Sequence, residues 1–237
     1  MTSTEPNSRQ RLSAAEHMND EKVHVLLAAS GSVATIKLPL IAKALAENPN
    51  VSVRVVVTQS AREFLQGQAD EQPSLKSLSA VSGIDGVYVD SDEWSKPWVR
   101  GDKILHIELR RWAHILLIAP LSANTMAKMA NGISDNLLTS VIRAWDTTGM
   151  IDMRKKYIMI APAMNTAMWR HPITNKQLKT IVQDWTDGDD CSVILLKPVE
   201  KELACGDTGD GAMMDWKQIV ARVAEHLKLK NLSNGDI

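Results

Sequence analysis

Short runs of aliphatic and β-branched residues alternate along this chain with segments whose apolar residues recur at helical spacing. The runs VHVLLAAS (residues 23–30) and VSVRVVVT (residues 51–58) flank a segment with apolar residues at positions 33, 36, 40, 41 and 45. A strand, a helix of about four turns and a second strand in this order predict a βαβ unit with a right-handed crossover.

The same alternation returns in the second half of the chain. Strands are predicted at residues 113–120, 155–162 and 191–199, each next to a helical pattern, and a closing helix is predicted at residues 215–229. Residues 67–101 predict loops with short elements. Near-continuous apolar strands require cover on both faces. The predicted fold class is therefore α/β: a single domain with an open parallel sheet and helices on both faces, Rossmann/flavodoxin-like.

Composition restricts the class of protein. The net charge of −1 gives no basic surface for nucleic acid, and the 2 cysteines, Cys191 and Cys205, form no disulfide framework. We therefore expect a reducing compartment, the cytoplasm. The longest apolar runs are far too short to cross a bilayer, so no membrane partner is expected. Residues 1–21 are polar without the apolar stretch of a signal peptide. They predict a disordered N-terminal tail before a domain at 22–229 and a short C-terminal tail at 230–237.

Hydroxyl side chains follow three of the predicted strands. Ser30-Gly31-Ser32-Val33 follows the first, Thr58 and Ser60 follow the second, and Ser122, Asn124 and Thr125 follow the strand at 113–120. Simple helix capping explains each site alone. Taken together, three hydroxyl-rich ends at one edge of a sheet favour the phosphate of a mononucleotide. The dinucleotide fingerprint G-x-G-x-x-G is absent from the first turn.

Two further segments carry candidate chemistry. In APAMNTAMWRHP, Asn165 follows a strand end, where it either orients a polar substrate group or only caps a helix. His106, in ILHIELRRWA, has a side chain suited to a base near neutral pH, although most such histidines are structural. Arg110 and Arg111 either bind phosphate or carboxylate or belong to a solvated helix face. No His, Cys, Asp or Glu spacing resembles a zinc site, so no metal is expected.

The segment LACGDTGDGAM (residues 203–213) places Cys205 among three glycines. A surface loop without a chemical role is the simplest interpretation, because glycine, aspartate and threonine are ordinary turn residues. A chemical role for the thiol requires partners elsewhere in the chain.

Six motifs, in order from about residue 23 to about residue 229, together resemble the flavin-containing cysteine decarboxylases: AASGSVA, HIELRRWA, IAPLSANTMAK, DNLLTSVIRAWD, APAMNTAMW and ACGDTGDGAM. The last two are highly specific, whereas the first is weak alone. The resemblance implies the cofactor FMN, bound by Gly31, Ser32, Val33, Thr58, Ser60, Ser122, Ala123, Asn124, Thr125 and Ala163.

The resemblance also implies the reaction and its residues. The implied substrate is 4'-phosphopantothenoylcysteine, which is converted to 4'-phosphopantetheine in coenzyme A biosynthesis by oxidation to a thioaldehyde, carboxylate loss and re-reduction of the enethiol. His106 is the implied base and Cys205 the implied thiol, on a glycine-rich flap. The implied substrate-binding residues are Asn165, Arg111, Ala204 and Met213.

The resemblance further implies a homotrimer with its flavin sites between subunits. Three other readings share the fold: a regulatory subunit that binds a protein phosphatase, a peptide-cysteine decarboxylase and a flavin prenyltransferase relative. The presence of His106, Asn165 and Cys205 together favours the enzyme of coenzyme A biosynthesis. Residues 67–101 and 147–156 are longer than the family resemblance leads us to expect. Neither segment includes a motif, so a difference is expected only in subunit contacts.

Overall fold

The computed structural model of the chain describes residues 12–69, 71–185, 192–202 and 208–229. The strands are β1 (Val23–Ala29), β2 (Val51–Val57), β3 (Ile84–Val89), β4 (Ile115–Leu121), β5 (Tyr157–Pro162), β6 (Val193–Leu195), β7 (Val199–Glu202) and β8 (Thr208–Ala212). The α-helices are α1 (Leu38–Ala46), α2 (Gln59–Arg62), α3 (Leu75–Ser79), α4 (Asp90–Glu93), α5 (Leu105–Trp112), α6 (Ala123–Ala130), α7 (Leu137–Arg143), α8 (Thr166–Arg170), α9 (Pro172–Lys179) and α10 (Trp216–His226). Two short 3-10 helices, η1 (Ala14–His17) and η2 (Val33–Lys37), and a π-helix, η3 (Thr180–Asp184), complete the described elements.

Six strands form one sheet in the order β3-β2-β1-β4-β5-β6, and every neighbouring pair is parallel. Val25 on β1 pairs with Val53 on one side and Ile115 on the other. The chain runs outward from β1 to β3 and then returns to β4, so the direction of winding reverses between β1 and β4. Open α/β sheets bind ligands beyond the strand ends at such a reversal. The predicted fold class, a doubly wound parallel sheet in one domain, is confirmed.

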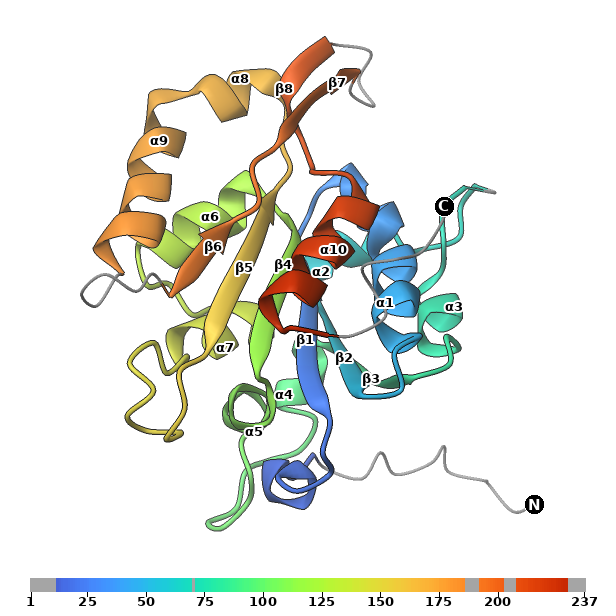
Figure 1. Ribbon diagram of the computed structural model, residues 1–237, viewed down its shortest axis with the longest axis vertical. Coiled ribbons are helices and arrows are strands. Elements are labelled where there is room, and N and C mark those ends of the chain that lie inside the picture. The colour runs from blue at the N-terminus through green and yellow to red at the C-terminus, as the bar shows by residue number, and fades with distance from the viewer. Residues whose placement is uncertain (1–11, 70, 186–191, 203–207, 230–237) are drawn as a thin grey trace.

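Alternate residues of each central strand feed two separate cores. On β1, Val25 and Leu27 join a core with Ile41 of α1 and Ile219 of α10, whereas Leu26 and Ala28 join a core with α5, α6 and α7. Figure 1 shows helices packed over both faces of the twisted sheet. All seven residues of β2 and of β4 are buried. The strands read as continuous apolar runs because neither face meets water.

A second, smaller sheet pairs β7 with β8 in antiparallel fashion. This pair lies at the top of Figure 1, next to α8 and away from the main sheet. The sequence patterns predicted a loop here, because β8 contains two glycines, which are unfavourable in strands. Residues 203–207 join the two strands and lie outside the described residues, and they include Ala204 and Cys205.

The amino-terminal segment differs from the prediction. Residues 1–21 were expected to be a disordered tail, but Leu12, Ser13 and Ala14 are buried and residues 14–17 form η1. The backbone N–H of Ala14 donates to Glu108 Oε2 at 2.8 Å, which ties the segment to α5. The prediction is therefore wrong for residues 12–20, because three small or apolar residues in an otherwise polar stretch are enough to dock it.

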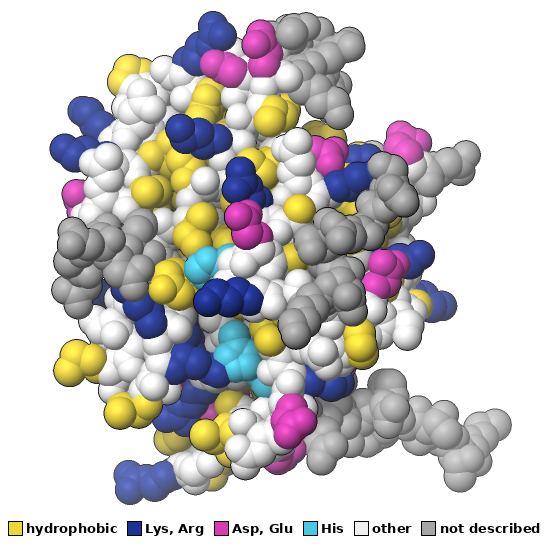
Figure 2. Space-filling view, in the orientation of Figure 1, with side chains coloured by type: hydrophobic (Ala, Val, Ile, Leu, Met, Phe, Trp, Pro, Cys, Tyr) yellow, Lys and Arg dark blue, Asp and Glu magenta, His cyan; other side chains and the backbone are white. Residues whose placement is uncertain are grey.

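The loop between α7 and β5 is held by one aspartate. Asp146 is buried, and its carboxylate accepts hydrogen bonds from the backbone N–H groups of Gly149, Ile151 and Asp152 at 2.7–3.0 Å. The fixed loop presents its hydrophobic side chains to solvent, and Met150 and Met153 are 79% and 87% exposed. Figure 2 shows hydrophobic side chains protruding among basic ones at the lower left of this face, in the region that the loop occupies in Figure 1.

No helix in the described ranges is both long and apolar enough to cross a membrane.

Aromatic rings stack where β1 begins. The His24 ring lies between Trp112 and His114, with ring centroids 4.6 and 4.8 Å apart. The His24 backbone N–H donates to His114 Nδ1 at 2.7 Å, so that nitrogen carries no proton. Burial, with Arg154 nearby, lowers the pKa of His114 to about 3.

This stack predicts a specific dependence of stability on pH. The pKa of His114 is about 3 in the folded protein and about 6.5 in an unfolded chain, so below about pH 6.5 the unfolded state binds a proton that the folded state does not. The free energy of unfolding should therefore fall as the pH drops from about 6.5 toward 3. In His114→Gln this slope should decrease by up to about 1.4 kcal/mol per pH unit, measured by urea denaturation. His171→Gln, at an exposed position, is the control. An unchanged slope in His114→Gln would contradict the assignment.

Candidate functional site

The ends of β1, β2 and β4 are joined by direct hydrogen bonds. Ser122 N–H donates to Ser30 Oγ at 2.8 Å, and Ser30 N–H donates to the Pro120 carbonyl at 3.0 Å. Thr58 N–H donates to the Ala29 carbonyl at 3.2 Å. The three strand ends therefore meet at the carboxyl edge of the sheet, where the winding reverses.

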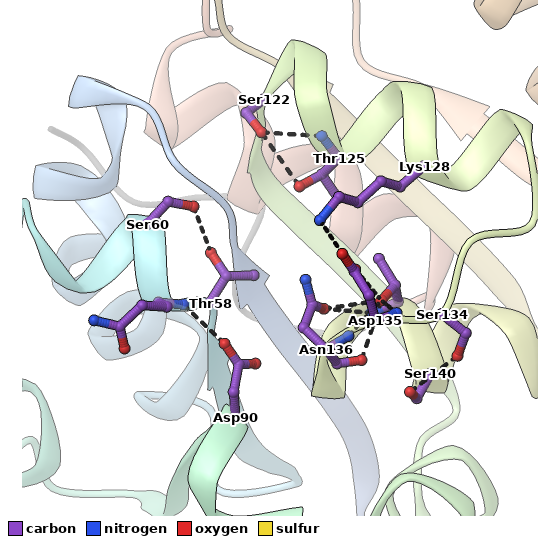
Figure 3. Close-up of polar contacts among 12 residues, drawn as sticks. Thr58, Ser60, Asp90, Ser122, Thr125, Lys128, Ser134, Asp135, Asn136 and Ser140 are labelled. Atoms are coloured by element: carbon purple, nitrogen blue, oxygen red, sulfur yellow. Dashed lines mark hydrogen bonds and ion pairs between the residues drawn. The ribbon is translucent and has the colours of Figure 1, made fainter.

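The hydroxyl groups cap the elements that follow each strand. Ser32, Thr58 and Ser122 accept hydrogen bonds from backbone N–H groups two or three residues ahead, at 3.3–3.4 Å. The capping alternative is thus observed at all three strand ends. Ser122 Oγ donates its own proton to Thr125 Oγ1 at 3.2 Å, and Thr58 and Ser60 share one hydroxyl bond at 3.3 Å. A ligand is still possible, because Ser32, Thr125 and one hydroxyl of the Thr58–Ser60 pair keep a proton to donate. Figure 3 shows the Thr58–Ser60 pair and the Ser122–Thr125 pair on either side of β1.

Gly31 allows close approach between the end of β1 and α2. A Cβ atom at this position would lie 2.7 Å from Ser60 Cβ and Oγ. A side chain here would displace Ser60, so glycine keeps the space beside the hydroxyl groups free. The other residues expected at FMN are Val33, Ala123, Asn124 and Ala163. Val33 and Asn124 are exposed and Ala163 is buried.

Asp90 belongs to this edge and was missed by the sequence analysis. Its Oδ2 accepts from Gln59 N–H at 3.0 Å and its Oδ1 accepts from Leu137 N–H at 3.2 Å, so it links α2 to α7. The sequence feature that could have identified Asp90 is an acidic residue directly after a strand. That strand, β3, lies within the region read as loops. Lys128 on the neighbouring α6 pairs with Asp135 at 2.6 Å.

Asn165 caps α8, with its Oδ1 accepting from Met168 N–H at 2.8 Å. The cap uses the carbonyl oxygen of the side chain and leaves the amide NH₂ for another acceptor. Asn165 is exposed. The structure thus combines the two sequence readings: a capping residue that also presents a donor.

Strand β8 packs directly on the Asn165 segment. Cβ atoms built at Gly209 and Gly211 would lie 1.6 Å from Thr166 Oγ1 and 2.3 Å from the Met164 carbonyl oxygen. Met164 N–H donates to the Gly211 carbonyl at 3.0 Å. These two glycines therefore serve close packing of β8 against the segment that carries Asn165. Met213, expected at the substrate, is half-buried against the core beside α1 and α10.

His106 lies at the start of α5, far from this segment. Its Nδ1 is 2.8 Å from Glu93 Oε1, and its backbone N–H donates to Glu93 Oε2 at 3.2 Å. Figure 1 shows α5 near the bottom of the molecule and α8 at its top. The predicted catalytic base and the predicted substrate amide are therefore not brought together within one chain.

The two arginines on α5 have different surroundings. Arg110 is buried and pairs with Asp152 at 2.7 Å, so it is not available to a substrate, contrary to one sequence reading. The Arg111 side chain is 55% exposed, and its Nη1 lies 3.5 Å from Glu108 Oε1, which is a long and weak ion pair. Lys156 Nζ donates to the carbonyls of Arg110 and Arg111 at 2.6 and 3.2 Å, which satisfies the last turn of α5. Burial lowers the pKa of Lys156 to about 8.

Two cavities lie apart from these residues. One of about 540 Å³ is lined by η1, β3 and Arg54, and one of about 270 Å³ lies between α6, α7 and Trp185. Neither is lined by a predicted site residue. Within the described ranges there is no group of three or more His, Cys, Asp and Glu side chains placed to hold a metal ion.

Sequence comparison shows similarity to known proteins. The flavoprotein family model matches residues 13–228. The chain is 43% identical over 219 residues to a phosphopantothenoylcysteine decarboxylase of Arabidopsis thaliana, covering 92% of each chain. It is 42% identical to the mouse enzyme of that name over 210 residues, covering 89% of this chain and 90% of the relative. A fission yeast protein, described as a probable thymidylate synthase, is 48% identical over 223 residues, but the chain spans only 32% of that relative's length and 94% of its own.

Solved structures agree in fold. A cysteine-to-serine mutant of PPC decarboxylase, complexed with pantothenoylaminoethenethiol, has a TM-score of 0.72 and 42% identity, with 87% of this chain and 99% of that chain covered. The FMN-binding protein AtHal3 has a TM-score of 0.70 and 43% identity, with 87% and 97% covered. Because the family model covers nearly the whole described domain and several relatives match end to end, this chain belongs to the flavoprotein family, among relatives named as phosphopantothenoylcysteine decarboxylases.

Proposed function

We propose that this chain binds FMN and decarboxylates 4'-phosphopantothenoylcysteine to 4'-phosphopantetheine. The observation that carries the proposal is the meeting of Ser30, Thr58 and Ser122 at the reversal of strand order, in a chain whose end-to-end relatives bear that enzyme's name. Relatives of much greater length also match, so the activity is proposed for this domain alone.

The hydroxyl groups and backbone N–H groups at the strand ends suit the FMN phosphate. Ser32, Thr125 and one hydroxyl of the Thr58–Ser60 pair supply side-chain donors, at an edge where Gly31 keeps a side chain out of the way. When bound, FMN supplies the two-electron oxidation of the carbon–sulfur end of the substrate and returns the electrons after carboxylate loss.

The chain's own side chains then bind and move protons. His106 accepts the substrate's proton, and the free NH₂ of Asn165 donates to the substrate carboxylate. Arg111, exposed and weakly paired, contacts the substrate phosphate or carboxylate. Oxidation to a thioaldehyde lets carbon dioxide leave as the substrate becomes an enethiol. Cys205, which lies outside the described residues, donates the proton that accompanies re-reduction of the enethiol.

The separation of His106 from Asn165 supports a homotrimer with sites between subunits. His106 and Asn165 lie at opposite ends of the folded molecule (Figure 1). They can act on the same substrate only if the histidine comes from one chain and the asparagine from another. A closed cyclic trimer provides three equivalent sites of this kind. We place the reaction in the cytoplasm, because two cysteines in a chain of this length suit a reducing compartment.

A regulatory subunit of a protein phosphatase is the alternative function. Some relatives carry the name HAL3 beside the decarboxylase name. A protein that acts only by binding needs neither a histidine paired with a buried carboxylate nor an amide presented at a helix cap, so these features support catalysis.

The direct test is anaerobic incubation of the purified, yellow protein with 4'-phosphopantothenoylcysteine, followed by mass analysis. Wild-type protein should release carbon dioxide continuously and form 4'-phosphopantetheine. Cys205→Ser should release about one carbon dioxide per site, because a hydroxyl is far less acidic than a thiol of pKa about 8.5. A product two hydrogens lighter should then accumulate. Cys191→Ser is the control and should behave as wild type. Protein without flavin, or flavoprotein without product, would contradict the function.

A second test uses mixed oligomers. His106→Asn and Asn165→Asp should each be inactive alone, since a catalytic base contributes about 10²–10⁴-fold and the new carboxylate repels that of the substrate. Co-expressed at equal amounts, the two variants should recover about a quarter of wild-type activity, because random assortment in a closed ring restores that share of the sites. Co-expression of two tagged copies of His106→Asn is the control. Mixed oligomers without activity would show that each site is built from one chain.

A further inference from the structure

We propose that Glu93 is the positioning residue that holds His106 in the tautomer and orientation a base requires. The inference rests on the proposed function for the role of His106, but it is carried by contacts of its own. It assigns a role in the reaction to α4, a four-residue helix that no sequence motif covers.

Both oxygens of the Glu93 carboxylate contact the same residue. Oε1 lies 2.8 Å from His106 Nδ1, and Oε2 accepts the His106 backbone N–H at 3.2 Å. The Glu93 side chain is 6% exposed and that of His106 is 22% exposed. One bond thus fixes the ring and the other fixes the backbone that carries it, so the imidazole has little freedom to turn.

The chemistry of the pair determines which nitrogen is free. An ionised carboxylate only accepts hydrogen bonds, so His106 Nδ1 must carry the proton and donate it. The lone pair is then on Nε2, which points away from Glu93 and is the atom that accepts a proton from a substrate. A carboxylate beside the ring also stabilises the imidazolium that forms when Nε2 takes that proton.

The backbone contact has a local reason. Helix α5 begins after Ile104, whose side chain makes no capping hydrogen bond. The first N–H groups of a helix have no partner within it, and a carboxylate is favoured there by the helix dipole. Ile104 cannot cap the helix with its side chain, so Glu93 of α4 supplies the capping carboxylate instead. The backbone N–H group that it caps is that of His106.

Helix α4 also connects His106 to the proposed FMN edge. It follows β3 directly, and its first residue, Asp90, accepts hydrogen bonds from Gln59 N–H on α2 and Leu137 N–H on α7. Asp92 accepts from Val89 N–H at 2.8 Å, which fixes the turn between β3 and α4. The three acids of α4 therefore connect the strand end, the turn and the base through hydrogen bonds.

The test is Glu93→Gln in the full-length, FMN-loaded protein. Glutamine keeps the size but offers one acceptor oxygen, and its NH₂ group directed at Nδ1 forces the proton onto Nε2. The kcat should fall about 10²–10⁴-fold, while KM, bound flavin and oligomeric state change little. Glu225→Gln removes a carboxylate that is 72% exposed on α10 and should leave kcat unchanged. An unchanged kcat in Glu93→Gln would overturn the proposal.

Two readouts separate positioning from a merely structural role. The double variant Glu93→Gln with His106→Asn should be no slower than His106→Asn alone, because Glu93 acts through His106; an additive loss would overturn the proposal. Nitrogen-15 NMR of the His106 ring should show the proton on Nδ1 in wild type and on Nε2 in Glu93→Gln. A wild-type ring protonated on Nε2 would also overturn it. The NMR result does not depend on turnover, so protein with the expected tautomer but no decarboxylation would reject the function and leave the positioning role intact.

Discussion

The hydrogen bonds that join the ends of β1 and β4 are the constraint on which the rest of this molecule depends. Winding reverses between these two strands, so the loops that follow them leave toward opposite faces of the sheet and their first residues lie at a common edge. Ser30 bridges the two strand ends with both its backbone and its side chain. Helix caps, donors and the close approach at Gly31 all follow from the fixed separation of these ends.

A second group of residues is built separately from the first. Met164, Asn165 and the glycines of β8 pack backbone against backbone, with no room for a Cβ atom at either glycine. The His106–Glu93 pair lies at the opposite end of the folded molecule, where α4 and the start of α5 hold it. Each group is held by its own contacts, yet a single chain keeps the two groups apart. Assembly thus becomes part of the proposed chemistry, because the oligomer would bring a base from one chain to an amide of another.

Much of this architecture was predictable from the sequence, and the exceptions share a physical cause. The strands at β1, β2, β4 and β5 are buried on both faces, so their apolar runs are unmistakable, and the hydroxyls that follow them could be placed correctly. Strand β3 lies at the edge and reads IDGVYV, with a glycine and an acid, so its pattern predicts only loops with short elements and does not point to Asp90 or Glu93. Docking of residues 12–20 and pairing of β8 rest on tertiary contacts between distant segments, which local patterns do not carry.

The most direct measurement of the central claim is a crystal structure of the assembled protein with FMN bound. The account predicts a flavin phosphate among Ser32, Thr58, Ser60, Ser122 and Thr125, with His106 and Asn165 of different chains facing the same flavin ring and Glu93 behind His106 Nδ1. A flavin bound elsewhere, or His106 and Asn165 of one chain meeting at a single flavin, would contradict it.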